Sequence, residues 1–282
     1  MQFTKPNADF FVPDNCEPTQ ALSRTTHMGI GAHQDDLEVF AFHGINACYE
    51  SNERWFSGVT VTDGAGSSRT GLYAAYTNEE MAEVRRKEQR KAAVVGDYSC
   101  MIQTMYASGE VKNPDQTGVV DDLQKILETA RPEVLYLHNP ADKHDTHIAV
   151  FLRCLSALRA MPAEQRPRNV YGVEVWRNLD WVLDDEKAHL PIEGRDNLAQ
   201  ALISLFDSQI SGGKRYDKAI PARALANATY LDSHATDEAH MVNWAMDLTP
   251  LVMDDEMNVE AFTLGYIDRF RKDVAGRLDR LS

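Results

Sequence analysis

Two kinds of apolar spacing alternate along residues 27–180 of the chain. Short apolar runs predict strands, at 27–33, 55–62, 101–106, 134–137 and 170–176. Between these runs, apolar positions three to four residues apart predict helices, at 38–51, 78–95, 118–129 and 145–159. Strands that alternate with helices in this way indicate an α/β fold, with a mostly parallel sheet covered by helices on both faces.

The two ends of the chain depart from this alternation. Residues 1–26 are polar and include Pro6 and Pro13, so they are expected to form an irregular amino-terminal arm. After about residue 181, apolar spacing predicts further helices, at 197–209 and 261–281, and more weakly at 222–230 and 239–246. No linker-like stretch divides the remainder. Residues 27–282 are therefore expected to form one domain with a carboxyl-terminal extension.

Composition and charge limit the kinds of molecule that this protein is expected to bind. The chain of 282 residues has 43 acidic and 29 basic side chains, which give a net charge of −14. Such a surface repels polyanionic nucleic acids and anionic membranes, and it favours a small neutral or cationic ligand. The four cysteines lie far apart, and no run approaches the ~18 apolar residues of a membrane span. The sequence therefore predicts a reduced, cytoplasmic protein without nucleic-acid or membrane partners.

The first predicted strand ends in a cluster of polar side chains. Its apolar residues are followed by His33, Gln34, Asp35 and Asp36, and a helical pattern begins directly afterwards. The carboxyl end of a strand, where a helix begins, is a common place for a catalytic or metal site in α/β proteins. The amino terminus of that helix also favours ionised carboxylates. We expect His33 and Asp36 to bind a metal and Asp35 to act as a base.

A second polar cluster follows the strand at 134–137. It contains His138, Asp142, His144, Asp145 and His147. Side chains three residues apart, such as those of His144 and His147, project from the same side of a helix. Because the carboxyl ends of parallel strands meet at one edge of a sheet, the two clusters are expected to face the same crevice.

The combined clusters predict a metal site. Three protein ligands of nitrogen and oxygen type, with water in a fourth position, are typical of catalytic zinc, and here they would be His33, Asp36 and His147. Imidazole and carboxylate ligands also suit Fe²⁺, Mn²⁺ or Co²⁺.

Four segments of the chain resemble, in the same order, the LmbE-like (PIG-L) family of deacetylases. Residues 32–38, Ala-His-Gln-Asp-Asp-Leu-Glu, are similar to the family motif Ala-His-Pro-Asp-Asp-x-Glu. Residues 142–147, Asp-Lys-His-Asp-Thr-His, are similar to Asp-x-His-Pro-Asp-His. The Thr-Asp-Gly turn at 62–64 and the Arg-x-x-Glu pattern within 85–96 resemble two further family segments. The resemblance covers roughly residues 27–180.

The resemblance implies a Rossmann-like three-layer sandwich and zinc-dependent hydrolysis of an N-acetyl amide on an amino sugar or its conjugate. It implies that His33, Asp36 and His147 bind the metal and that Asp35 is the general base. In the same way, it implies that His144 stabilises or protonates the developing charge and that Arg85 contacts the substrate.

Three positions depart from the family motifs. Gln34 and Asp145 stand where the motifs have proline, which removes rigidity but no reactive group. Thr146 stands where the family has an aspartate that is expected to orient a catalytic imidazole. Asp142 and Asp145 are the candidates to orient His144 instead, although Asp145 would point about 100° away if the backbone there is helical.

Alternative functions remain open at the level of the sequence. One is an amidase that acts on a thiol or other conjugate of an amino sugar. Another is a non-catalytic sugar-binding protein, which the threonine at position 146 keeps open. A third is phosphoryl transfer with Mg²⁺ on Asp35 and Asp36, which His33 and His147 disfavour because Mg²⁺ prefers oxygen ligands. The expected partner is a small N-acetylated sugar or conjugate, and the amino-terminal arm leaves room for a homo-oligomer.

Overall fold

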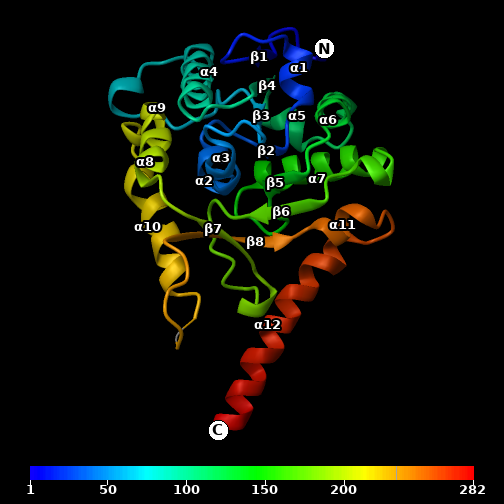
Figure 1. Ribbon diagram of the computed structural model, residues 1–282, viewed down its shortest axis with the longest axis vertical. Helices are drawn as coiled ribbons and strands as arrows, with labels where there is room; N and C mark the ends of the chain where they lie inside the picture. The colour runs from blue at the N-terminus through cyan, green and yellow to red at the C-terminus, as the bar shows by residue number, and fades with distance from the viewer. Residues whose placement is uncertain (233) are drawn as a thin grey trace.

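The computed structural model describes residues 1–232 and 234–282, and a single mixed sheet of eight strands runs through it (Figure 1). The strands are β1 (Asp9–Phe11), β2 (His27–Gly31), β3 (Phe56–Thr62), β4 (Cys100–Tyr106), β5 (Val134–His138), β6 (Asn169–Val173), β7 (Ala188–Ile192) and β8 (Met241–Asp247). Their order in the sheet is β1-β4-β3-β2-β5-β6-β8-β7. The central strands from β4 to β6 are parallel, while β1, β8 and β7 pair antiparallel.

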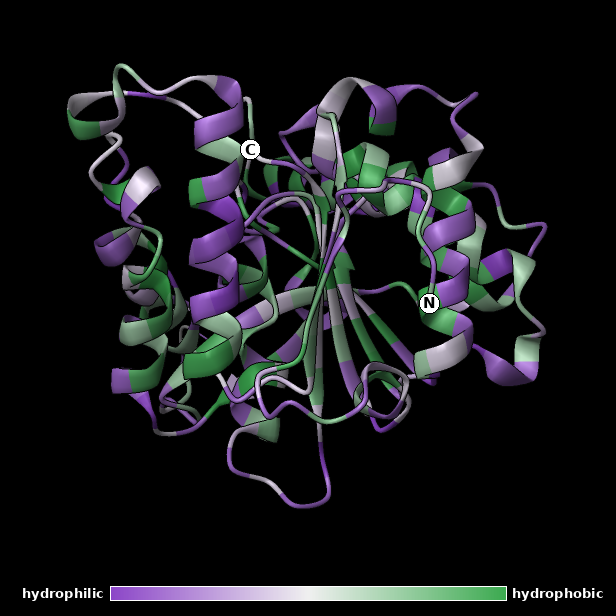
Figure 2. Ribbon diagram, turned by 90° about the horizontal axis from the view of Figure 1, so that it is seen from above, coloured by the Kyte–Doolittle hydropathy of each residue, from purple (hydrophilic) through white to green (hydrophobic). Residues whose placement is uncertain are grey.

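Helices cover both faces of this sheet, as Figure 2 shows with the sheet seen nearly edge-on. One face packs against α1 (Pro18–Ser23), α5 (Ser108–Lys112), α6 (Thr117–Ala130), α7 (Asp145–Ala160) and α11 (Thr249–Met253). The other packs against α2 (Asp36–Phe40), α3 (Phe42–Cys48), α4 (Asn78–Val95), α8 (Asp196–Ser204) and α10 (Tyr216–Thr229). The short helix α9 (Asp207–Ile210) precedes α10, and α12 (Val259–Leu281) ends the chain. The fold is therefore the predicted three-layer α/β sandwich.

Close packing of α2 on the sheet positions the first polar cluster. A side chain at Gly58 of β3 would lie 2.7 Å from Leu37 Cδ1, so glycine allows α2 to sit directly on β3. Leu37 and Phe40 are fully buried in this contact. The turn before α2, which carries Asp35, is thereby held at the carboxyl end of β2.

The strand and helix pattern predicted for residues 27–180 is confirmed. The helix over 78–95 is found with the predicted bounds, and Thr77 and Glu80 close it with reciprocal side-chain bonds to the backbone. One difference is that residues 38–51 form two helices, because the backbone at Ala41 leaves the helical region.

The prediction is wrong in several places outside this region. The weak helical pattern at 239–246 is strand β8, buried along most of its length between β6 and β7. That packing outweighs local propensity. The predicted helix 197–209 is divided into α8 and α9, and β7 was not expected. The arm at 1–26 is not irregular, since it contains α1 and also β1, which pairs with β4.

The carboxyl-terminal extension completes the sheet with β7 and β8 and adds α8 to α10 over one face. Helix α12 leaves the body of the molecule and projects away from it (Figure 1). Among the described residues, no helix is both long and apolar enough to cross a bilayer. The division of the chain at about residues 26 and 181 stays a prediction.

Candidate metal centre and substrate cavity

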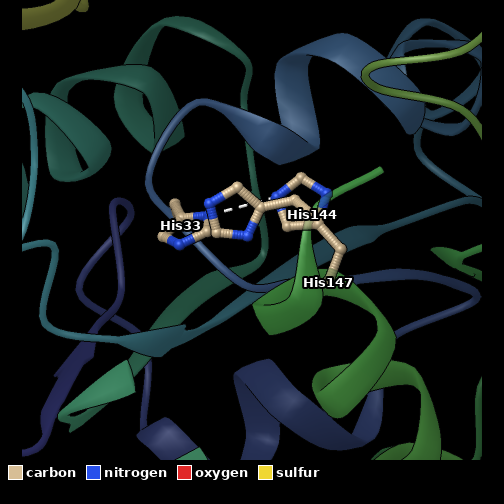
Figure 3. Close-up of side chains that lie close together, drawn as sticks. All are labelled: His33, His144 and His147. Atoms are coloured by element: carbon tan, nitrogen blue, oxygen red, sulfur yellow. Dashed lines mark hydrogen bonds between the residues drawn. The ribbon is translucent and has the colours of Figure 1, made fainter. Parts of the chain in front are cut away.

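The two polar clusters meet at the carboxyl ends of β2 and β5. These neighbouring strands flank the point where the strand order reverses, which is where open α/β sheets bind ligands. Figure 3 shows the imidazoles of His33, His144 and His147 gathered there, the first from the turn after β2 and the others from the start of α7. The predicted convergence of the two clusters is therefore present in the structure.

The side chains of the three predicted ligands lie close together. Nδ1 of His33 lies 3.2 Å from Nε2 of His147 and 3.4 Å from Oδ2 of Asp36. Nε2 of His147 lies 3.5 Å from Oδ1 of Asp36. Ligands at 2.0–2.2 Å from a tetrahedral zinc ion are separated by about 3.3–3.6 Å. The donor set of two imidazoles and one carboxylate suits a divalent ion such as Zn²⁺, with the two rings facing different oxygens of Asp36. That these three side chains are the ligands stays a prediction.

Two further histidines lie near these atoms. Within the described part of the chain, His33, His144 and His147 form one group close enough to share an ion, and Asp36, His138 and His147 form another. Nε2 of His138 accepts a hydrogen bond from the Ala32 N–H at 2.9 Å, so its lone pair is already used. The ring of His138 stacks on that of His147, with 3.9 Å between the ring centroids. Sequence reasoning did not include His138 in the site, although it ends β5 just as His33 follows β2.

Asp142 contacts both histidines at the start of α7: its Oδ1 accepts a hydrogen bond from the His144 backbone N–H at 2.8 Å, and its other oxygen faces the ring of His147. Its Oδ2 lies 3.2 Å from Nδ1 of His147, which leaves Nε2 of that ring to face the other ligands. A carboxylate behind a metal-binding imidazole fixes the ring and raises its basicity. Burial lowers the pKa of His147, but the carboxylates of Asp36 and Asp142 outweigh it and raise the pKa overall. Asp145 is exposed at the start of α7, and its expected role in orienting His144 stays a prediction.

His144 is oriented by the backbone. It caps the start of α7, where its Nδ1 accepts a hydrogen bond from the Thr146 N–H at 3.2 Å. The proton of the neutral ring therefore sits on Nε2. Burial, together with the nearby rings of His33 and His147, lowers the pKa of His144. The hydrogen bond to Nδ1 leaves Nε2 of His144 facing away from the backbone, and this orientation needs no carboxylate at position 146.

Asp35 occupies a strained turn beside the three ligands. Its φ of 90° lies in the left-handed region, which costs a non-glycine residue on the order of 1–3 kcal/mol. The surroundings hold it there: its N–H donates to Gln89 at 3.2 Å, and both terminal nitrogens of Arg85 lie 3.4 Å from its Oδ2. Strain of this kind is concentrated at functional sites.

Burial sets the protonation of Asp35. It raises the pKa of this carboxyl to about 7; Arg85 opposes the rise, while Asp36 and Glu38 add to it. Arg85 is 1% exposed and also donates to the carbonyl of Gln34, so it does not belong to a solvated helix face. Its guanidinium instead fixes Asp35 at the wall of the cavity.

Gly64 has no side chain, and this leaves room for the side chains of Gln34 and Arg85 next to Asp35. Its φ is +70°, and a Cβ there would lie 2.4 Å from Oε1 of Gln34 and 3.0 Å from Cγ of Arg85. Gln34 cannot move freely, because its amide donates to the Thr62 carbonyl and to Gln103. The turn at 62–64 is thus shaped to fit the residues beside Asp35.

We expect Gly64→Ala to lower the free energy of unfolding by about 1–3 kcal/mol, because both the backbone conformation and the contact are unfavourable. Gly66→Ala is the matched control, since a Cβ at Gly66 meets nothing within 4 Å. Urea unfolding of the two variants measures the difference. Equal stability of both would contradict the close fit at Gly64.

The predicted ligands His33, Asp36 and His147 line a cavity of about 570 Å³. Asp35, Arg85 and His144 line it as well. Further lining comes from α10 and the segments before it, through the side chains Val175, Trp176, Gln209, Lys214, Tyr216, Ile220 and Arg223. No role could be assigned to these positions from the sequence, because they are brought to the site only by the packing of the extension.

Comparison with known proteins identifies the class. Residues 28–158 match the family model described as PIG-L: GlcNAc-PI de-N-acetylase. This part of the chain therefore belongs to the PIG-L (LmbE-like) family, as the motifs around His33 and His147 indicated. No curated protein sequence matches the chain.

Solved structures share the fold at low sequence identity. The hydratase GalB of Pseudomonas putida KT2440, which acts on 4-carboxy-2-hydroxymuconate, is 16% identical, with a TM-score of 0.62 over 79% of this chain and 96% of its own. The N,N'-diacetylchitobiose deacetylase of Pyrococcus horikoshii is 15% identical, with a TM-score of 0.58 over 82% and 86%. The A40926 pseudoaglycone deacetylase Dbv21 is 13% identical, with a TM-score of 0.57 over 79% and 97%.

Proposed function

We propose that this protein is a metal-dependent hydrolase that removes an N-acetyl or related acyl group from an amino sugar or amino-sugar conjugate. The observation that carries the proposal is the spacing of His33, Asp36 and His147, with Asp35 beside them at the wall of a sugar-sized cavity. The description of the matching family, a de-N-acetylase, supports it. So do similar folds among deacetylases of chitobiose and of a pseudoaglycone.

The metal would be held by His33, Asp36 and His147. Zn²⁺ in this position, or Fe²⁺, Mn²⁺ or Co²⁺, would acidify water and polarise the amide carbonyl. The donor set of two imidazoles and one carboxylate suits these ions better than Mg²⁺.

The side chains of the protein would then move the protons. Oδ2 of Asp35 is held by Arg85, so Oδ1 is the atom that accepts a proton as water attacks the carbonyl carbon. The Nε2–H of His144 donates to the oxygen that becomes negative. As the C–N bond breaks, the proton held by Asp35 passes to the departing nitrogen. The products are acetate and a free amine.

Acetate release from a panel of N-acetylated sugars tests this proposal. The panel should include N-acetylglucosamine, N,N'-diacetylchitobiose and a thiol conjugate of an acetylated amino sugar. Metal-loaded protein is expected to release acetate and amine in equal amounts from at least one of them, and chelator-treated protein is expected to release none. A metal-loaded protein that binds a sugar of the panel without releasing acetate would favour the non-catalytic alternative.

Thr146→Ala is expected to keep kcat/KM within about threefold of wild type, because the backbone N–H of residue 146, not its side chain, orients His144. His144→Ala removes the donor itself and is expected to lower kcat by about 10²–10³-fold. Steady-state kinetics on the best substrate of the panel compares the two. A loss in Thr146→Ala as large as in His144→Ala would show that the threonine side chain has a role of its own.

A further inference from the structure

The backbone of Asp35 is held by a side chain that takes no part in the reaction steps described above. The Asp35 N–H donates to Oε1 of Gln89 at 3.2 Å, and Gln89 is fully buried on α4. Arg85, four residues earlier on the same face of this helix, holds the carboxylate of Asp35. Successive turns of α4 therefore hold both the side chain and the backbone of the proposed base.

The amide of Gln89 is itself fixed by a carboxyl group. Its Nε2 donates to Oε1 of Glu38 at 2.8 Å, and the hydroxyl of Tyr98 donates to the same oxygen at 2.7 Å. Because the Asp35 N–H needs an acceptor and Oε1 of Glu38 accepts, the amide of Gln89 satisfies both partners in one orientation only. We call Tyr98, Glu38 and Gln89 the buried relay.

The buried relay crosses an apolar layer between α2, α4 and the sheet. Glu38 is 4% exposed and Tyr98 2%, and the ring of Tyr98 packs edge-on against Phe56 with 4.7 Å between the centroids. Polar groups in such a layer lose their hydration, and apolar side chains would fill the same space without that cost. What the relay adds to packing is one hydrogen-bond acceptor, placed at the backbone of Asp35.

Asp35 needs that acceptor because its backbone is strained. Its φ of 90° is unfavourable for a residue with a side chain, and Asp35 itself is buried. A buried N–H without a partner is costly, so the bond to Gln89 favours the strained turn over a relaxed one. A relaxed turn would move the carboxyl of Asp35, and a displacement of about 1 Å at a reacting group can lower a rate by about 10²-fold.

We propose that Gln89 is a positioning residue: through the buried relay it holds Asp35 in the left-handed conformation that presents its carboxyl group to the cavity. This inference rests on the proposed function, in which Asp35 is the base, and adds a residue that does not touch the substrate. Gln89 does not line the cavity, so its loss should affect the rate of the reaction and not the binding of substrate.

Gln89→Met tests the position of the base, because methionine keeps most of the volume but neither accepts nor donates in this way. We expect kcat to fall by about 10- to 100-fold, KM to stay within about twofold, and bound metal to stay at the wild-type amount. Steady-state kinetics and metal analysis measure these three quantities. Wild-type kcat in this variant would overturn the proposal.

Asn227→Leu is the matched control. Asn227 is also a buried amide with one bond of each kind: it donates to the Val242 carbonyl at 3.0 Å and accepts from Asn178 at 2.9 Å. It does not line the cavity. Urea unfolding should show a loss of stability in both variants, while kcat falls in Gln89→Met alone. An equal fall of kcat in both would mean that lost stability, and not the position of Asp35, lowers the rate.

Tyr98→Phe is a milder probe at the far end of the buried relay. It removes one hydroxyl and leaves Gln89 bonded to Glu38, so kcat is expected to fall by only about two- to fivefold. Tyr106→Phe is its control, since the buried hydroxyl of Tyr106 also donates to a carboxylate, that of Asp122, at 2.8 Å. Equal kcat in the two variants would remove Tyr98 from the relay.

A double-mutant cycle shows whether Gln89 acts through Asp35. In Asp35→Asn protein the base is already absent, so adding Gln89→Met should lower the residual turnover by less than about twofold. In the presence of Asp35 the same change is expected to cost about 10- to 100-fold. Losses that multiply in the double variant would show that Gln89 acts elsewhere, and they would overturn the proposal.

Hydrogen exchange separates this proposal from the proposed function. If wild-type protein releases no acetate from the sugar panel, the proposed function fails for those sugars, and exchange of the Asp35 amide, followed by NMR, still tests the buried relay. Exchange is expected to be at least about tenfold faster in Gln89→Met than in wild type, with the amides of β2 unchanged. Equal exchange at Asp35 in the two proteins would overturn the positioning role, whether or not the protein is active.

Discussion

Replacement of His147 by alanine is expected to abolish both metal binding and turnover. His147 belongs to both groups of side chains that can share an ion, and its Nε2 lies within 3.5 Å of a ligand atom on each of the other two predicted ligands. Its removal leaves His33 and Asp36, which are too few to hold Zn²⁺ against water. Metal analysis after dialysis, followed by acetate release, measures both losses.

Graded variants sharpen this test. Asp142→Asn keeps the predicted ligand His147 but removes the negative charge that faces Nδ1 of its ring. Metal affinity should therefore fall by about 10- to 100-fold. His189→Ala serves as the control, because His189 is exposed on β7 and far from the site in the sheet order. Full metal occupancy in His147→Ala protein would remove this residue from the metal site.

Asp35→Asn is expected to lower turnover by about 10²–10⁴-fold while metal stays bound. Asparagine has nearly the same shape and tolerates the left-handed backbone at this position, but it cannot accept a proton. Metal analysis should therefore match wild type although the reaction is nearly lost. Unchanged turnover in this variant would refute the assignment of Asp35 as the base.

The pH dependence of the reaction follows from the same residue. Asp35 acts as a base only when it is deprotonated, so kcat/KM should rise with pH and then level off. The pKa of Asp35 is about 7 without a metal, and a divalent cation on Asp36 lowers it. The midpoint of the rise should therefore lie below 7 in metal-loaded protein, and the rise should be absent in Asp35→Asn. A profile that falls as pH increases through this range would contradict the mechanism.

The sequence was most informative where chemistry follows a strand directly. His33, Asp35 and Asp36 come straight after β2, and His144 and His147 open α7, so local pattern and motif order were enough to bring them together. The α/β fold class could be predicted for a similar reason, because strand-like apolar runs alternate with helix-like apolar spacing along the chain. Strand β8 was missed because its burial depends on β6, about seventy residues earlier, and not on its own spacing.

Side-chain partners were harder to predict than positions. Asp142 was expected to orient His144, and it bonds the backbone N–H of that residue, while its other oxygen faces the ring of His147. His138 could not be distinguished from a core residue until β5 was paired with β2. The wall formed by Trp176, Tyr216 and Arg223 depends on how α10 packs, which no local signal specifies.

The cavity is built from two stretches of chain, and the family model matches only the first of them. The side chains proposed to hold the metal and move protons lie within residues 33–147, in the segment that the family model matches. Further lining comes from residues 175–223, beyond that segment. Changes in α10 can therefore alter which conjugate is accepted while the reaction stays the same. In a lineage of such proteins, selectivity is free to diverge faster than chemistry.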